Sequence, residues 1–328
     1  MPGLEYIPHF LHSQWLVKPG YPSRSFAGQT VIVTGSNQGL GLEAARHIVR
    51  LGAEKVILAV RSIDKGNAAK REIEQSTGRP GVVQVWSLDL QSYDGVKKFA
   101  ARTTQELTRL DVLLENAGIS TSKWTLAENQ ESTITTNVIS TFLLALLLLP
   151  KLKESAQEFG IKPHLVIVSS EVHYFSGLPH RKEKYGPIFE TLAKKSQFKA
   201  GDSYFTSKLL VVLIIRQIVE EEAKFGYPVI INNINPGLCR TGLARDAGWA
   251  QYIAFTVFHA RSTELGSRTL VDAASFGSES HGQYLSDCRI ATVSSFVTST
   301  EGQKTGKQAW SELKIILEEI QPGILGCF

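Results

Sequence analysis

Thr34-Gly35-Ser36-Asn37-Gln38-Gly39-Leu40-Gly41 decides the fold, because it joins a β-branched run at Thr30–Thr34 to a segment of helical period at Leu42–Leu51. Glycines permit a tight turn and let backbone N–H groups at a helix N-terminus approach a diphosphate, which the helix dipole attracts. A strand before and a helix after are the context that a dinucleotide-binding turn requires. We therefore predict that the cofactor contacts of this turn are Gly35, Asn37, Gln38, Gly39, Leu40 and Gly41.

The same alternation of strand and helix continues along the chain. Short apolar runs predict strands at Thr30–Thr34, Lys55–Ala59, Val82–Leu88, Val112–Leu114, Leu165–Val168 and Val229–Ile234. Segments of 3.6-residue period between them predict helices, among them Leu42–Leu51, Val96–Thr108, Ser132–Lys153 and Ser203–Phe225. Strands that are apolar on both faces indicate a parallel sheet covered on both sides. The sequence thus predicts an α/β fold with a doubly wound parallel sheet (Rossmann) of about seven strands.

The two ends of the chain are less regular. Residues 1–25 are aromatic and proline-punctuated, and we expect an N-terminal arm that lies on the surface of a single domain at 26–328. A last short strand is expected at Gly282–Leu285. An amphipathic helix at about 306–320, ended by Pro322 and Gly323, is expected to pack against the sheet edge.

Composition excludes several classes of protein. The 328 residues are 43% hydrophobic and 20% charged, and the net charge of +4 comes from 35 basic and 31 acidic residues spread along the chain. That distribution does not favour nucleic-acid binding. Three separated cysteines show no metal-ligand spacing, so we expect no metal and a reducing compartment. Met1–Gly20 lacks a signal-peptide pattern, and the apolar run Phe142–Leu149 is too short to span a bilayer, so we expect a cytoplasmic protein without a membrane span.

The end of the second strand indicates which dinucleotide binds. NAD enzymes place an acidic residue there to bind the ribose hydroxyls, whereas this chain has Ala59-Val60-Arg61. An arginine can pair with a 2′-phosphate, so Arg61 favours NADP(H) over NAD(H). A solvated surface arginine is the alternative.

The next two strand ends supply further candidate cofactor contacts. Leu88-Asp89-Leu90 ends the third strand, and Asp89 could accept from the adenine amino group or cap the next helix. We count Asp89 and Leu90 as cofactor contacts. Asn116-Ala117-Gly118 ends the fourth strand, and its small residues let the backbone pass close to a ligand.

Tyr204 and Lys208 form the candidate catalytic pair. They are four residues apart in a helical segment and therefore share one face. The preceding strand ends at Val168-Ser169-Ser170, which brings Ser170 to the carboxyl edge of the sheet, where ligands of such sheets bind.

These motifs together resemble the short-chain dehydrogenase/reductase family. They are the glycine turn at 34–41, Asn-Ala-Gly at 116–118, Ser170, the YxxxK pattern at 204–208 and Asn235-Pro236-Gly237, in the order of the family. Val60-Arg61 with Lys65-Gly66, and the segment Gly282–Cys288, are similar to the retinol-dehydrogenase-like branch. The general pattern also resembles reductases of filamentous-fungal secondary metabolism.

The resemblance implies a role for each matching residue. Tyr204 would be the general acid or base, Lys208 would lower its pKa and hold the nicotinamide ribose, and Ser170 would bind the substrate oxygen. Asn137 fits the helix asparagine that holds a relay water. The remaining implied cofactor contacts border the nicotinamide and are Pro236, Gly237 and Thr241.

Several departures from the family pattern leave alternatives open. Ser170 and Tyr204 are 34 residues apart, so the segment at 172–202 is expected to form a lid or a surface excursion. Ser169 competes with Ser170 for the serine role. Glu115 stands where the family often has asparagine, and no glycine follows Asn137 closely. His173 and Tyr174 are expected to pack rather than to line a pocket.

Two apolar segments bear on partners and substrate. Leu143–Leu149 is expected to be a buried helix face, and a homodimer formed through that helix is an open alternative. The segment at 238–260 is the expected substrate loop, and its aromatic residues favour a hydrophobic substrate, with coverage of the core or of a partner as the alternative. Those residues are Trp249, Tyr252, Phe255 and Phe258.

The sequence therefore predicts an NADP(H)-dependent carbonyl reductase, or the corresponding alcohol dehydrogenase, acting on an apolar molecule such as a fungal secondary metabolite. Two other functions fit the same fold. One is a cofactor-assisted cyclisation or isomerisation without net consumption of the nicotinamide. The other is a non-catalytic NADP-binding regulator.

Overall fold

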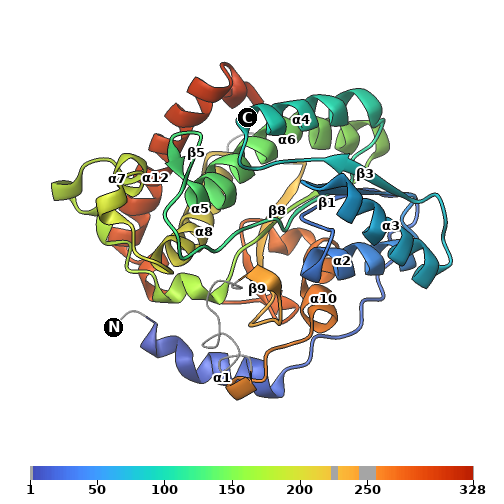
Figure 1. Cartoon of the computed structure of the whole chain (residues 1–328), viewed down its shortest axis with the longest axis horizontal. Coiled ribbons are helices and arrows are strands. Elements are labelled where there is room, and N and C mark those ends of the chain that lie inside the picture. Colours follow the sequence, from blue (N-terminus) through green and yellow to red (C-terminus); the bar gives the residue numbers. More distant parts are fainter. Residues whose placement is uncertain (1–2, 223–227, 244–255, 328) are drawn as a thin grey trace.

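An eight-stranded sheet forms the centre of the molecule in the computed structural model, which describes residues 3–222, 228–243 and 256–327 (Figure 1). Its strands, in chain order, are β1 (Thr30–Thr34), β2 (Lys55–Val60), β3 (Val83–Ser87), β4 (Val112–Glu115), β7 (His164–Val168), β8 (Ile230–Asn235), β9 (Tyr284–Ser286) and β10 (Arg289–Ile290). A separate two-stranded hairpin consists of β5 (Leu126–Ala127) and β6 (Gln130–Glu131).

The strand order confirms the predicted doubly wound parallel sheet. The order is β10-β9-β8-β7-β4-β1-β2-β3, and all neighbours are parallel except β9 and β10. The eighth strand, β10, exceeds the expected seven because it is a two-residue hairpin partner of β9. The turn between β9 and β10 has Asp287 and Cys288 in the left-handed conformation, with φ of 54° and 58°. Such turns usually contain glycine or asparagine, so this sequence did not indicate a hairpin.

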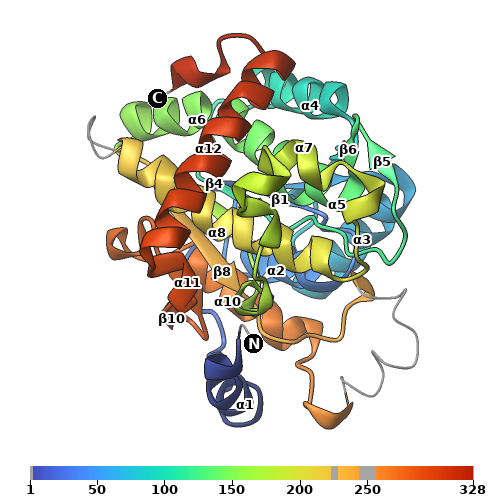
Figure 2. The ribbon, with the colours of Figure 1, turned by 90° about the vertical axis from the view of Figure 1, so that its left-hand side faces the viewer.

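Two layers of helices cover the sheet (Figures 1 and 2). One layer packs against Ile32 and Leu113, and its helices are α4 (Tyr93–Glu106), α6 (Ser140–Phe159), α8 (Asp202–Glu222) and α12 (Thr300–Ile320). The other packs against Val33 and Leu114, and its helices are α2 (Gly39–Arg50), α3 (Ile63–Thr77) and α10 (Thr263–Ala273). Adjacent strand residues face opposite layers, as the two-residue period of a strand requires.

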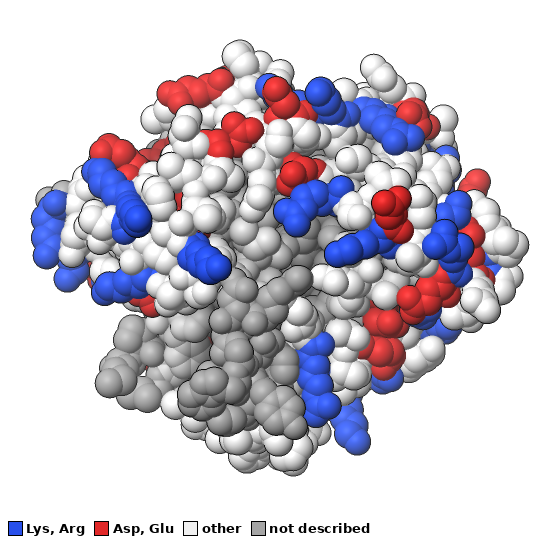
Figure 3. All heavy atoms as spheres, in the orientation of Figure 1, with Lys and Arg blue, Asp and Glu red and all other residues white. Residues whose placement is uncertain are grey.

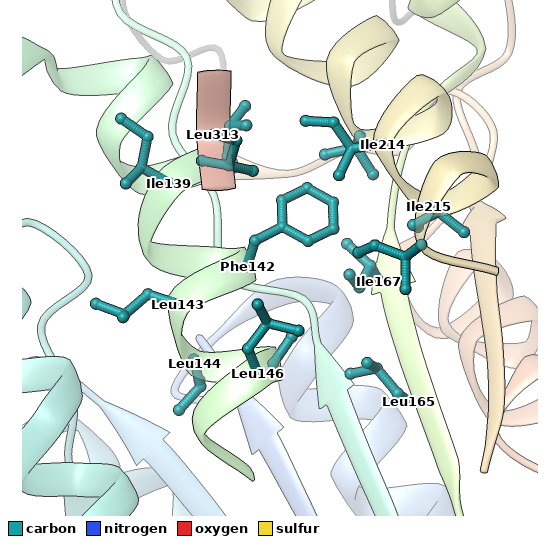
Figure 4. Close-up of a cluster of buried hydrophobic side chains, with 14 of the residues drawn as sticks. Ile139, Phe142, Leu143, Leu144, Leu146, Leu165, Ile167, Ile214, Ile215 and Leu313 are labelled. Carbon is teal, nitrogen blue, oxygen red and sulfur yellow. The ribbon is translucent and has the colours of Figure 1, made fainter. Parts of the chain in front are cut away.

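The larger core cluster is built around α6. Figure 4 shows the ring of Phe142 between Ile167 of β7, Ile214 of α8 and Leu313 of α12. All four side chains are at most 2% exposed. Leu143–Leu149 is likewise buried except for the half-buried Leu147, so this chain's own elements cover that face.

The helix before α6 differs from the predicted continuous helix at Ser132–Lys153. Its first turn is α5 (Ser132–Ile134), and a π-helical turn, η2 (Thr135–Ile139), connects it to α6. The whole segment Ser132–Phe159 is long and apolar enough to cross a membrane, but 94% of its most apolar window is buried inside the protein. That burial is typical of a core helix.

The N-terminal residues are helical rather than irregular. They form η1 (Leu4–Tyr6) and α1 (Ile7–Leu16), and the side chains of Tyr6, Ser13 and Gln14 are buried. The expectation of an arm lying on the surface missed this burial, because the partners of these side chains are more than 160 residues away in the sequence.

The segment at 172–202 is a surface excursion that packs closely on the rest of the protein. It consists of short turns, η3 (Glu171–Phe175), η4 (Pro179–Arg181), η5 (Glu183–Tyr185), α7 (Ile188–Leu192) and η6 (Lys195–Gln197). Figure 2 shows α7 beside α12, where Glu312 accepts from the backbone N–H of Phe189 at 3.1 Å and Arg181 pairs with Glu301 at 2.8 Å. This segment is therefore a fixed surface excursion that covers the core.

The tail closes the fold. It contains η8 (Ser278–Ser280), α11 (Ser295–Thr298), α12 and η9 (Ile324–Cys327). Helix α12 begins six residues before the predicted 306, because Ser299 caps it by accepting from the N–H of Gly302 at 3.0 Å. On the face in Figure 3, basic and acidic side chains are interspersed.

The core around α6 yields a stability prediction. Phe142→Ala removes a fully buried ring and leaves a cavity, so it should lower the free energy of unfolding by about 3–5 kcal/mol. The measurement is urea unfolding followed by circular dichroism. Ile315→Ala, at a side chain 62% exposed on α12, should change that free energy by less than about 1 kcal/mol. Equal losses for the two variants would contradict the described packing.

Candidate active site

The glycine turn brings the ends of β1 and β4 together. Gly35 has φ of +65°, and a Cβ added there would lie 2.9 Å from Cα of Ala117. A Cβ added at Gly41 would lie 2.5 Å from Nδ2 of Asn116. Both positions therefore require glycine for close approach of two backbone segments.

Thr34 and Asn116 satisfy the backbone groups at this junction. The hydroxyl of Thr34 accepts from the N–H of Asn116 at 3.0 Å and from that of Ala117 at 2.9 Å. Asn116 Nδ2 donates to the carbonyl of Thr34 at 2.9 Å. The sheet order reverses between these strands, and ligands of doubly wound sheets bind at that point.

The first turn of α2 fits a dinucleotide diphosphate. Gly39 has φ of +64°, and a Cβ added there would meet nothing within 4 Å. Gln38 precedes the helix and makes no capping hydrogen bond with its side chain. Serines cap four other helices, α3, α4, α10 and α12. The uncapped N–H groups of α2 therefore face open space with the polarity that attracts an anion.

Arg61 directly follows β2 at the same edge of the sheet. Its side chain is exposed and makes no ion pair or hydrogen bond within 3–222, 228–243 and 256–327. Lys65, in the first turn of α3, is also exposed. The two cations are close in sequence at the place where a 2′-phosphate would lie.

Asp89 forms a turn of its own after β3. Its carboxylate accepts from the N–H of Gln91 at 2.9 Å. The cap of α4 is Ser92, which accepts from Gly95 at 3.2 Å, so the capping alternative for Asp89 is wrong. Leu90 is buried in the core beside it.

Ser170 and Tyr204 interact at the carboxyl edge. Tyr204 lies in the first turn of α8, and the Ser170 side chain lies close enough to its phenol to lower the pKa of that group. Burial raises the pKa of Tyr204 to about 12, against the lowering effect of Ser170, and the nearby Glu171 raises it further. Ser169 is buried and donates to the carbonyl of Lys208 at 3.4 Å. The structure thus brings Ser170 to the phenol and turns Ser169 toward the backbone of α8.

Lys208 lies one turn after Tyr204 on the same face. Its Nζ is 5.7 Å from the centre of the Tyr204 ring and donates to the carbonyl of Val168 at 2.7 Å. Burial lowers the pKa of Lys208 to about 8. The ammonium group of Lys208 is therefore held near the phenol. Because its pKa is lowered, it begins to lose its proton as the pH rises through about 8.

Asn137, in the turn η2, hydrogen-bonds the segment after β4 and helix α8. Its Oδ1 accepts from the N–H of Ile119, and its Nδ2 donates to the carbonyl of Ile119, both at 2.9 Å. Nδ2 also donates to Ser207 of α8 at 3.0 Å. A Cβ on Gly118 would lie 3.1 Å from Oδ1 of Asn137 and 3.9 Å from Nζ of Lys208, so these groups surround one point.

Two residues beside Ser170 pack as the sequence indicated. His173 is fully buried, and its Nδ1 donates to the carbonyl of Ser170 at 2.8 Å while its Nε2 accepts from Ser294 at 3.2 Å. Burial lowers the pKa of His173 to about 4, so the ring is neutral at physiological pH. Tyr174 is buried and donates to the carbonyl of Thr292 at 2.6 Å.

Glu171 was not singled out in the sequence, and Asn235 was named only as part of the Asn-Pro-Gly motif, without a role of its own. Asn235 Oδ1 accepts from the N–H groups of Glu171 and Gly237, both at 3.1 Å. Its Nδ2 donates to the Glu171 carboxyl group at 3.2 Å. Asn235 therefore joins the Ser170 side of the site to the Pro236-Gly237 side. The Asn-Pro-Gly motif was the signal that could have identified it.

The far side of the site is only partly within the described residues. Pro236 and Gly237 follow β8 directly, and the Thr241 hydroxyl accepts from the N–H of Leu243 at 3.4 Å. Of the expected substrate loop, Trp249, Tyr252 and Phe255 lie outside the described residues. Phe258 is described, and its ring centre is 5.3 Å from that of Phe10.

Glu115 is the departure from the family pattern with a visible physical consequence. Its carboxyl group is buried without a hydrogen-bond partner among the described residues. Burial raises the pKa of Glu115 well above its usual range, because desolvation disfavours the charged form of the carboxyl group. The adjacent Asn116 makes the polar contacts of the junction.

Comparison with known proteins agrees with this geometry. The family model for short chain dehydrogenases matches residues 29–181. The chain is 48% identical over 322 residues to the short chain dehydrogenase/reductase dmxR8 of a Cryptosporiopsis species, covering 97% of this chain and 99% of that protein. It is 43% identical over 325 residues to the short-chain dehydrogenase anuD of Penicillium roqueforti, covering 96% and 84%. A crystal structure of an uncharacterised protein from Mycobacterium paratuberculosis superposes with a TM-score of 0.69 at 27% identity, covering 90% and 96% of the two chains.

The first turn of α2 yields a matched pair of variants. Gly39→Ala places a methyl group in the open space at the helix start, so it should weaken NADPH binding at least tenfold, as read by isothermal titration calorimetry. Gly78→Ala, at the C-terminal cap of α3, has the same left-handed φ (+66°) and the same open surroundings. Both should lose roughly 1 kcal/mol of stability through backbone strain. Equal NADPH affinities in the two variants would refute the assignment of the first turn of α2 as the diphosphate-binding site.

Proposed function

The chain belongs to the short-chain dehydrogenase/reductase family, and from that membership we propose that it transfers hydride between NADP(H) and a carbonyl or alcohol group of a hydrophobic small molecule. The observation that carries the proposal is the meeting of Ser170, Tyr204 and Lys208 beside the junction of β1 and β4. A nicotinamide bound there supplies the hydride chemistry, and the chain supplies position and protons.

Tyr204 is the proposed proton donor in reduction and acceptor in oxidation. The Ser170 side chain lies beside its phenol, so a substrate oxygen bound here would accept a hydrogen bond from each of the two hydroxyl groups. Ser170 is held in turn by His173, which donates to the Ser170 carbonyl. Two fixed donors stabilise the negative charge that develops on the oxygen.

Lys208 and Asn137 are the proposed supports of this step. Lys208 would hold the nicotinamide ribose and favour the phenolate of Tyr204 by its charge, while the carbonyl of Val168 fixes its position. The Asn137 side chain binds Ile119 and Ser207, which leaves one lone pair of its Oδ1 for a relay water. Its side chain keeps the Gly118 turn aligned with α8.

The proposed preference for NADP(H) rests on Arg61 and Lys65. Both are exposed at the end of β2, and Arg61 has no acidic partner within the described ranges that would compete with a phosphate. A guanidinium can bind two phosphate oxygens at once.

The proposed substrate is an apolar ketone or aldehyde, or the corresponding alcohol, of the kind found among fungal secondary metabolites. Supporting this class are the fungal origin of the curated relatives and the aromatic pair of Phe10 and Phe258 beside the expected substrate loop. Apolar and aromatic linings favour apolar ligands.

Tyr204→Phe is the direct test of the mechanism. Removing the phenol hydroxyl should lower kcat by about 10²–10⁴-fold, because no other positioned group can exchange the proton. NADPH affinity should stay within about twofold. The assay follows NADPH absorbance with a panel of apolar ketones and aldehydes. Tyr185→Phe, on the remote turn η5, should retain full turnover. Retained turnover in Tyr204→Phe would sink the mechanism, and turnover of substrate without NADPH consumption would favour cyclisation or isomerisation.

Arg61→Asp tests the cofactor preference. Replacing the cation by an anion should raise the KM for NADPH roughly ten- to hundredfold through loss of the phosphate contact, while the KM for NADH stays the same or falls. Arg71→Asp makes the same charge change at an exposed site of α3 and should shift both values by less than about threefold. An unchanged NADPH to NADH ratio in Arg61→Asp would remove the basis for NADP(H).

A further inference from the structure

Gln14 of α1 holds the backbone directly after Gly237. Its Oε1 accepts from the N–H of Leu238 at 2.9 Å, and its Nε2 donates to the carbonyl of Leu238 at 3.1 Å. A Cβ added to Gly237, whose φ is +78°, would lie 2.7 Å from Oε1 of Gln14. One side chain from the N-terminal helix therefore fixes both polar groups of a residue 224 positions away.

Arg261 fastens the same two segments from the other side. Its Nη1 donates to the carbonyl of Pro236 at 3.0 Å, and its Nη2 donates to the carbonyl and hydroxyl of Ser13 at 3.0 and 3.2 Å. Nη2 also pairs with Asp287 at 2.6 Å, and both side chains are at most 2% exposed. A buried charge is tolerated only when it is paired and hydrogen-bonded in this way.

Tyr6, the last residue of η1 and the N-cap of α1, reaches the Ser170 side of the site. Its hydroxyl donates to Oε2 of Glu171 at 3.2 Å, and its ring stacks on Tyr174 with centres 4.0 Å apart. Asn235 binds both Glu171 and Gly237. The N-terminal helix therefore contacts the ends of β7 and β8 at once, through side chains that are buried.

We propose that helix α1 positions the active site, with Gln14 holding the Gly237–Leu238 turn against the nicotinamide end of NADP(H) and Tyr6 holding Glu171 next to Ser170. The inference rests on the proposed function and extends it to residues outside the family's motifs. A turn that is already ordered before binding does not lose its conformational entropy on binding, so affinity rises. Gln14 and Tyr6 are positioning residues, since neither touches the proposed reacting atoms.

Gln14→Met tests the first contact. Methionine keeps the length and volume of the side chain and removes both hydrogen bonds to Leu238. We expect the Kd for NADPH, measured by calorimetry, and the KM of the carbonyl substrate to rise by about fivefold or more, with kcat within about twofold. Hydrogen exchange of the peptide containing Leu238 should quicken in the cofactor-free protein, because its N–H loses its acceptor. His12→Ala, at an exposed site of the same helix, is the matched control and should change none of these values.

Tyr6→Phe tests the second contact while keeping the ring stacked on Tyr174. We expect a raised KM or a lowered kcat for the carbonyl substrate, with the Kd for NADPH unchanged, because Glu171 adjoins Ser170 rather than the glycine turn. The proposal is overturned if both variants match His12→Ala in Kd, KM, kcat and hydrogen exchange, or if they lose only melting temperature. Failure of the proposed function is separate, since the unmodified protein would then fail to bind NADPH or to oxidise it.

Discussion

The site depends on one constraint. Strands β1 and β4 separate at their carboxyl ends, and the backbone groups at those ends still need hydrogen-bond partners. These neighbouring strands lead to opposite sides of the sheet, so the ladder between them ends at Val33 and Leu114. The Thr34 hydroxyl and the Asn116 amide replace the missing partners. Because an unpaired buried N–H costs roughly 1–3 kcal/mol, this replacement makes the opening at the switch point stable. The glycine turn after β1 and the Asn116-Ala117-Gly118 segment after β4 border that opening.

The proposed catalytic residues converge because parallel strands bring all their carboxyl ends to one edge. Ser170 follows β7, Gly118 follows β4, and Tyr204 begins the helix that packs between them. The π-helical turn at Thr135–Ile139 adds a residue before α6, and Asn137 in that turn reaches both Ile119 and Ser207. Such turns frequently mark functional sites. Here the π-helical turn lets Asn137 link the segment after Gly118 to α8.

How much could be predicted from the sequence depended on the distance between partners along the chain. The glycine turn and the Tyr204–Lys208 pair are local patterns, whose geometry follows from helix and turn periods alone. The doubly wound parallel sheet was predicted because strands alternate with helices in a regular order, whereas the preference for Ser170 over Ser169 came from its position in the family motif. Gln14, Arg261 and Asp287 carry no local signal, since each interacts with a residue at least 26 positions away. For the same reason α1 was expected to lie on the surface, and the π-helical turn was taken as ordinary helix.

The buried pair of Arg261 and Asp287 explains why an N-terminal helix of only ten residues stays docked. A helix of that length is marginal in water and depends on tertiary contacts. Without the carbonyls of Ser13 and Val17, Arg261 would keep its charge partner Asp287 but lose buried hydrogen-bond acceptors on the N-terminal segment, and an unsatisfied buried donor costs roughly 1–3 kcal/mol. Undocking α1 would therefore expose that guanidinium's partners together with the polar groups of Leu238. Separating α1 from the site would break the two hydrogen bonds between Gln14 and Leu238, and these bonds also order the turn after Gly237. Docking of the helix and ordering of the turn are therefore coupled.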